Sequence, residues 1–236
     1  MTLSRKISKT LKLVLVFMIA CFICIGNFSS KDVVSAASAK NNAPKVAELT
    51  IFSFSHYDIH MRHAFISIKN INKRPLDIFY APVPAGYSKT IGTRGVDNTD
   101  FEKYGSGIYT NVEAFKLQKH NAYSGRVSLS TKITAKQLDT INKWMRDNNK
   151  HTYWHNCTWF SSKVWNLVCP DDLKLGCGAP PNPNVLSKNI MKKSGYKTNA
   201  SIGKCDMNNI TRFINSKKSI KIPPENIRSA IYSHIW

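Results

Sequence analysis

The feature of the sequence that most constrains its fold is a change in the spacing of apolar residues near Thr134. Before this position, short segments such as 63–69 alternate apolar and polar residues, which is typical of strands that bury one face. After it, apolar residues recur every three or four positions, which indicates amphipathic helices. This order predicts a single α+β domain in which an antiparallel sheet from the first half packs against helices from the second.

Strands are expected wherever short β-prone runs lie between turn residues. The expected strands cover residues 49–54, 63–69, 76–80, 87–91, 109–115 and 126–130. The segments 76–80 and 87–91 flank a loop rich in proline and glycine, 82–86, so they are predicted to form a hairpin.

Two helix starts carry capping signals. Thr134 and Gln137 match a capping box, which predicts a helix over 135–148. Asn156 is a favoured N-cap residue and predicts a second helix over 157–168. Further helices are expected at 185–193 and after the Pro-Pro-Glu sequence at 223–225.

The first 39 residues have the pattern of a signal peptide. A basic start is followed by an apolar run over 13–26 and then by small residues, so cleavage is expected after Ala39, with Ala36 as a second choice. The apolar run is too short for a typical transmembrane helix. Lipid attachment at Cys21 stays open, because the residues before it loosely resemble a lipobox. We therefore expect a bacterial protein that is secreted or held at the cell surface.

The domain over residues 40–236 is strongly basic. The chain has 34 basic and 14 acidic residues, a net charge of +20. Residues 1–39 hold five of the basic residues and one acidic residue, which leaves +16 for the domain. An anionic partner is expected, such as a wall polymer or lipid headgroups. Nucleic acid is the weaker alternative, because no binding module is recognisable. We expect a monomer with no stable membrane span.

Four cysteines belong to the domain: Cys157, Cys169, Cys177 and Cys205. Thiols outside the cell tend to pair, and any two of the last three residues are candidates for a disulfide. Two disulfides, one of them using Cys157, are the alternative. The spacing does not fit a zinc knuckle, and neither a metal nor a cofactor is expected.

Cys157 follows the capping Asn156 and begins the second helix. The free amides and the positive dipole end of a helix N-terminus favour a thiolate, which is the nucleophilic form of cysteine. The same amides offer a site for an oxyanion. Cys157 also shares a stripe with Phe160 and Val164, which directs it toward the sheet. The competing interpretation is a buried structural thiol.

His63 is the candidate base. It begins an alternating strand and shares a face with Phe65 and Ser67. The alternative is a structural histidine. Asp77 is the favoured partner to orient the imidazole, because a carboxylate stabilises imidazolium, and Asn70, Thr93, His56 and Asp58 are the other candidates.

The order of these elements resembles a known superfamily. A strand with Arg-His-Ala-Phe-Ile-Ser-Ile over 62–68 precedes a helix that begins with Asn-Cys-Thr-Trp-Phe over 156–160. This order is similar to the circularly permuted branch of the NlpC-type papain-like superfamily, which includes lecithin:retinol acyltransferase-like proteins. Segments 90–95, 125–130 and 193–199 also resemble uncharacterised exported proteins of Gram-positive bacteria.

The resemblance implies a papain-like fold and a thiol-based acyl reaction, with Cys157 as nucleophile and His63 as base. Export and basic charge favour hydrolysis of an amide bond in cell-wall peptides. One alternative is an acyltransferase or lipid hydrolase on the same scaffold. Another is a non-catalytic protein that binds the wall or a host.

Overall fold

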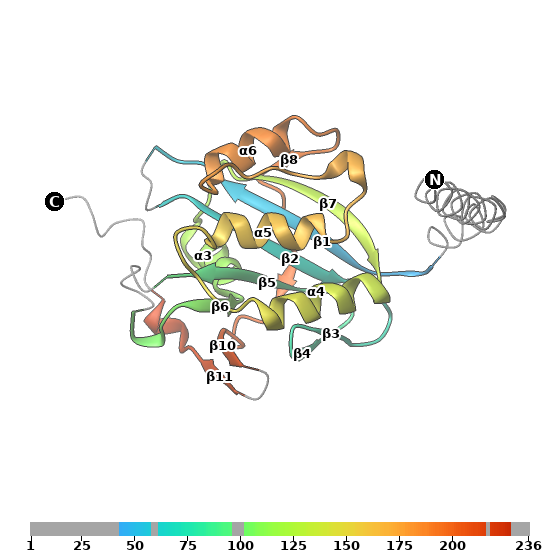
Figure 1. The fold of residues 1–236 in the computed structure, drawn as a ribbon. Coiled ribbons are helices and arrows are strands. Elements are labelled where there is room, and N and C mark those ends of the chain that lie inside the picture. The colour runs from blue at the N-terminus through green and yellow to red at the C-terminus, as the bar shows by residue number, and fades with distance from the viewer. Residues whose placement is uncertain (1–42, 58–60, 96–101, 216–217, 228–236) are drawn as a thin grey trace, which may run out of the picture. The chain divides into compact units, whose positions relative to one another are not determined.

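The computed structural model describes residues 43–57, 61–95, 102–215 and 218–227 (Figure 1). The predicted signal peptide and the tail beyond Ile227 lie outside these residues. A compact unit begins at Pro44, and the description below concerns this unit alone. Within the described ranges, no helix is long and apolar enough to cross a membrane.

The centre of the unit is a twisted sheet whose strands run antiparallel, except that β9 pairs with β5 in parallel. The strand order is β11-β10-β6-β5-β2-β1-β7-β8. The strands are β1 (Lys45–Phe54), β2 (His63–Asn70), β5 (Tyr87–Arg94), β6 (Gly107–Thr110), β7 (Val127–Thr134), β8 (Lys197–Thr198), β9 (Lys204–Cys205), β10 (Thr211–Asn215) and β11 (Lys218–Lys221).

The predicted hairpin between 76–80 and 87–91 is wrong. The hairpin joins β3 (Leu76–Ile78) to β4 (Ala81–Val83), and β5 pairs with β2 instead. Phe79 and Tyr80 form the turn, both with positive φ, at 44° and 64°. Two residues of this handedness match the twist of a tight hairpin, so the chain reverses earlier than the proline and glycine residues suggest.

The four α-helices of the described residues lie on both faces of the sheet. They are α3 (Val112–His120), α4 (Ala135–Asp147), α5 (Cys157–Asn166) and α6 (Pro183–Met191). The last three cover one face and α3 lies on the other (Figure 1). The predicted capping box is confirmed, because Gln137 N–H donates to Thr134 Oγ1 and Gln137 Oε1 accepts from Thr134 N–H. Of the helix predicted in the tail, the described residues include a short 3-10 turn, Pro224–Asn226, and the remainder lies outside them.

The strand expected over 109–115 is also wrong, because β6 ends at Thr110 and α3 begins at Val112. Asn111 turns the chain with a left-handed backbone, φ 60°. Its side chain accepts from Thr90 N–H and donates to the carbonyls of Asp206 and Asn209. These partners lie far away in the sequence, so the local alternation of apolar and polar residues does not predict this turn.

The alternation of β2 sorts its side chains between two cores. Ile66 and Ile68 pack with the helices α4, α5 and α6. Phe65 packs on the opposite face, where its ring stacks on Phe52 at 4.8 Å between centroids. The unit is therefore a two-sided antiparallel sheet with helices, which is compatible with the predicted α+β class.

Candidate active site

Cys157 is the first residue of α5, and Asn156 caps the helix as predicted. Asn156 Oδ1 accepts from the amides of Thr158, at 3.0 Å, and Trp159, at 3.2 Å. The cap explains why the helix begins here, since two of its unpaired amides gain an acceptor. The Cys157 side chain is a free thiol, and the residue is partly exposed.

Asn156 does not supply an oxyanion donor, contrary to one role considered from the sequence. Its amide nitrogen donates to the carbonyls of Tyr153, at 3.2 Å, and Pro181, at 2.8 Å. Both of its N–H groups are therefore used. The backbone N–H of Cys157 has no hydrogen-bond partner among the described residues, and this group is the donor that remains for an oxyanion.

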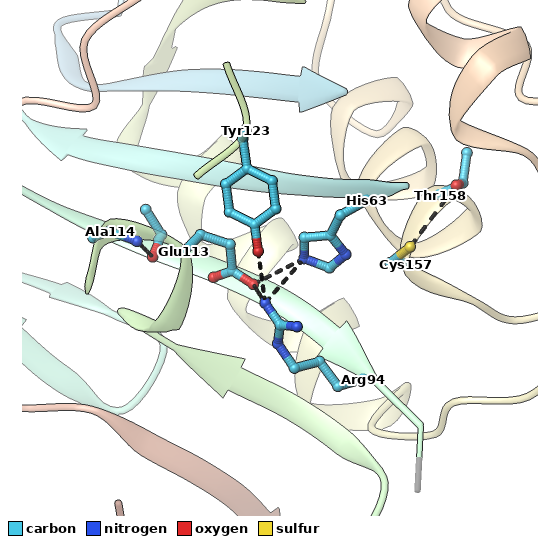
Figure 2. Close-up of polar contacts among 8 residues, drawn as sticks. His63, Arg94, Glu113, Ala114, Tyr123, Cys157 and Thr158 are labelled. Carbon is cyan, nitrogen blue, oxygen red and sulfur yellow. Dashed lines mark hydrogen bonds and ion pairs between the residues drawn. The ribbon is translucent and has the colours of Figure 1, made fainter. Parts of the chain in front are cut away.

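His63 begins β2 and pairs with Phe54, the last residue of β1. Its ring lies on the α3 side of the sheet, stacked on Phe65 at 5.9 Å and beside Tyr123 at 5.7 Å. This face is the one expected from the alternation. The ring lies between the Glu113 carboxylate and Cys157 (Figure 2). It is 7% exposed, so its contacts operate largely out of water.

Glu113 is the partner of His63 in the structure. Glu113 Oε1 lies 3.0 Å from His63 Nε2, and its side chain is fully buried. A carboxylate only accepts, so Nε2 carries a proton and Nδ1 is the nitrogen left for the thiol. Because Glu113 lies in the first turn of α3, which the sequence predicted as a strand, this residue was missed.

The favoured partner Asp77 is corrected by this geometry. Asp77 is an exposed residue of the short strand β3, whereas Glu113 occupies the Nε2 position. Asn70 donates to the carbonyls of Arg74 and Val83 and so supports a loop. Thr93 is buried on β5, and Asp58 lies outside the described residues.

Arg94 extends the chain of polar contacts inward. Its Nη2 donates to Glu113 Oε1 at 3.0 Å and to the Tyr123 hydroxyl at 3.2 Å (Figure 2). It also lies 3.5 Å from His63 Nε2. Because that nitrogen already donates to Glu113, we interpret this contact as proximity of charges. Arg94 itself is 6% exposed.

The pKa values of the thiol and the imidazole move toward each other. Burial acts to raise the pKa of Cys157, but the charge of His63 and a hydrogen bond with it, together with the Ala64 amide and the Thr158 hydroxyl, lower it overall. Burial and Arg94 act to lower the pKa of His63, yet Cys157 and then Glu113 raise it overall. Both shifts favour a thiolate–imidazolium pair.

Glu113 is held as a carboxylate. Burial alone raises a carboxyl pKa, but the hydrogen bond from His63 and the charges of Arg94 and His63 lower the pKa of Glu113 to about 2. With the thiolate and imidazolium formed, charges alternate in sign from Cys157 through His63 and Glu113 to Arg94. Their sum is zero, which reduces the cost of burying four ions.

Gly92 makes room for this arrangement. It lies on β5, and a Cβ atom there would stand 2.6 Å from Glu113 Oε1 and 3.3 Å from His63 Nε2. Any side chain at this position would push the carboxylate away from the imidazole. A single glycine in a strand is a weak sequence signal, and its role appears only with the contacts across the sheet.

None of the disulfides considered from the sequence is present in the described residues, where all four cysteines are free. Cys169 and Cys205 are buried, and burial raises their pKa values to about 11 and about 12. The surroundings of Cys157, in contrast, lower the pKa of its thiol. No cluster of three potential metal ligands occurs in the described part of the chain.

Family models, curated proteins and solved structures were each compared with the chain, and none of them matches it. The geometry of Cys157, His63 and Glu113 is therefore the basis for a functional assignment.

Proposed function

We propose that this protein is a secreted thiol hydrolase that cleaves an amide bond through an acyl-enzyme. Cys157 is the nucleophile, His63 the acid–base group and Glu113 the residue that orients His63. One observation carries the proposal: the His63 imidazole contacts the Glu113 carboxylate through Nε2 and lies between that carboxylate and the Cys157 thiol (Figure 2). A buried carboxylate, an imidazole and a thiol at a helix start are the parts of an activated cysteine.

The reaction follows from these positions. The Cys157 thiolate attacks the carbonyl carbon, and the Cys157 N–H stabilises the oxyanion that forms. His63 gives its proton to the leaving amine as the carbon–nitrogen bond breaks, which leaves a thioester. His63 then takes a proton from water, and hydroxide attacks the thioester to release the acid and regenerate the thiolate. Glu113 stays ionised throughout and stabilises the imidazolium.

The resemblance to the permuted papain-like order supports the same proposal. A sheet carries the histidine ahead of the cysteine helix in the chain, and α5 packs against β2 and β1. The predicted export signal and the basic domain favour peptides of the cell wall as substrate. The free thiol beside His63 favours catalysis over the non-catalytic alternative, which would be expected if Cys157 were in a disulfide.

Alkylation of the full chain with iodoacetamide, resolved by site with mass spectrometry from pH 4 to pH 10, tests the proposal. We expect Cys157 to react at mildly acidic pH, where an ordinary thiol is protonated. Cys177, which is also partly exposed, is the internal control. The His63→Ala variant should lose the reactivity below pH 7. A Cys157 that titrates like Cys177, or that is unaffected by His63→Ala, would refute the dyad.

Hydrolysis is tested separately with purified wall peptides, by measuring the release of new amino groups. Wild type should release them, and the Cys157→Ser and His63→Ala variants should be at least 100-fold slower, given the usual contribution of nucleophile and base, roughly 10² to 10⁴. A reactive Cys157 without any release would keep the dyad and reject the wall-peptide substrate.

A further inference from the structure

Two large aromatic side chains are held in solvent directly before the nucleophile. Tyr153 is 70% exposed and Trp154 is 58% exposed, and their rings contact each other edge to face at 5.6 Å. The turn that carries them is fixed, because His155 N–H donates to Thr152 Oγ1 at 3.0 Å and Asn156 donates to the Tyr153 carbonyl. Both aromatic side chains are therefore exposed on a turn that hydrogen bonds hold in place.

The outer face of α6 combines lysines with exposed apolar side chains. Val185, Lys188 and Lys192 follow one another at spacings of three and four residues and are all exposed. Met191 and Tyr196 are each 44% exposed in the same segment. Between residues 173 and 205 the chain has six lysines and no acidic residue. Lys188, Lys192 and Lys197 have no carboxylate partner among the described residues.

The aromatic turn and α6 meet at the start of α5. The two N–H groups of Asn156 donate to Tyr153 on one side and to Pro181 on the other. Pro183 then begins α6, and its carbonyl accepts from Ser53 Oγ near the end of β1. We call Tyr153, Trp154, Val185, Lys188, Met191, Lys192, Tyr196 and Lys197 the aromatic–lysine surface. Its aromatic turn directly precedes Asn156 and Cys157 in the chain.

We infer that the aromatic–lysine surface docks on an anionic lipid bilayer. Tryptophan and tyrosine favour the interface between headgroups and acyl chains, and lysines are attracted to anionic headgroups. A soluble polyanion would use the lysines but would leave the exposed aromatic and aliphatic side chains in water. A bilayer would contact both the lysines, through its headgroups, and the aromatic and aliphatic side chains, through its interface. The inference does not depend on catalysis by Cys157, although docking would bring a membrane close to that thiol.

Quenching of tryptophan fluorescence by vesicles with brominated acyl chains tests this surface in the full chain. Residues 1–42 contain no tryptophan, so membrane insertion of that apolar segment gives no signal of its own. The contribution of Trp154 is the difference between the wild type and the Trp154→Phe variant. With phosphatidylglycerol vesicles we expect Trp154 to be quenched at least threefold more strongly than with phosphatidylcholine vesicles.

The variant with Lys188, Lys192 and Lys197 all changed to Gln should lose most of this difference. Lys69, Lys73 and Lys119 changed to Gln form the matched control, since these lysines are also exposed and the net charge changes equally. Lys69 and Lys119 lie on the α3 side of the sheet. Circular dichroism melts establish that both variants are folded.

Equal quenching of Trp154 by the two lipids, or equal effects of the two triple variants, would overturn the inference. So would binding to polyphosphate that depends on Lys188, Lys192 and Lys197 without quenching of Trp154 by any vesicle. That last result would assign the surface to a soluble polyanion.

Discussion

Glu113 Oε1 lies 3.0 Å from His63 Nε2 although the two residues are 50 positions apart in the chain. The same oxygen accepts from Arg94 at 3.0 Å, and the carboxylate is fully buried. Glu113 therefore sets the tautomer of His63 and stabilises its charged form. The proposed thiolate–imidazolium pair depends on this buried charge.

The Glu113→Gln variant should keep a hydrogen-bond acceptor for His63 and lose the negative charge. The imidazolium is then less stable, so the pKa of His63 falls and that of Cys157 rises. One pKa unit is a tenfold change in thiolate below the pKa, so alkylation of Cys157 at pH 6 should fall about tenfold or more. Asp77→Asn is the control, and an equal loss in both variants would contradict the role of Glu113.

The Gly92→Ala variant should disrupt the site without changing any charged residue. The new Cβ would lie 2.6 Å from Glu113 Oε1, and this oxygen is held by His63 and Arg94, so it has little freedom to retreat. We expect the free energy of unfolding to fall by about 1–3 kcal/mol, as for other overpacked sites. Alkylation of Cys157 at pH 6 should slow in the same variant.

Gly176→Ala is the matched control for Gly92→Ala. An added Cβ at Gly176 meets only Asn189 Nδ2, at 3.6 Å, which is ordinary contact. Denaturant unfolding and alkylation should both match the wild type. If Gly92→Ala behaved like Gly176→Ala, the close approach of Glu113 to β5 would be wrong.

Stability in acid should depend on Glu113. Its pKa in the folded protein is lowered to about 2 from the ordinary value of 4.5. The stabilisation is therefore complete above pH 4.5 and is lost as the pH falls from 4.5 toward 2. The shift corresponds to about 3 kcal/mol. Urea unfolding across this range should show a shallower pH dependence for Glu113→Gln than for wild type. Equal slopes would show that the carboxylate is not stabilised by folding.

The Asn156→Asp variant should separate capping from chemistry. Aspartate still caps α5, but it cannot donate to the carbonyls of Tyr153 and Pro181, which should cost about 1–2 kcal/mol of stability. Its negative charge beside the thiol should raise the pKa of Cys157 and slow alkylation at pH 6. A faster reaction at that pH would contradict this expectation.

Thr134→Asp is the control for an acid placed at a helix cap. Thr134 pairs with Lys45 at one end of β1, whereas His63 pairs with Phe54 at the other end. About nine residues of extended strand separate them, roughly 30 Å. The cap of α4 should tolerate the acid with no change at Cys157.

Local signals in the sequence were sufficient for several parts of the site. The cap at Asn156, the capping box at Thr134 and the start of α5 at Cys157 all depend on contacts within four residues. The alternation around His63 placed its ring on the same face as Phe65. These features are local because helix caps and strand faces follow from the geometry of neighbouring residues.

Only the tertiary structure identified Glu113, Arg94 and Gly92. Glu113 reaches His63 because Asn111 turns the chain out of β6 into α3, and the bonds that hold this turn reach residues about 20 and nearly 100 positions away. Arg94 and Gly92 matter because β5 pairs with β2. Strand pairing brings together residues that share no spacing in the chain. A buried charge network of this kind therefore leaves no periodic pattern in the sequence. Its cysteine and histidine are different, because a helix cap and a strand alternation mark their positions.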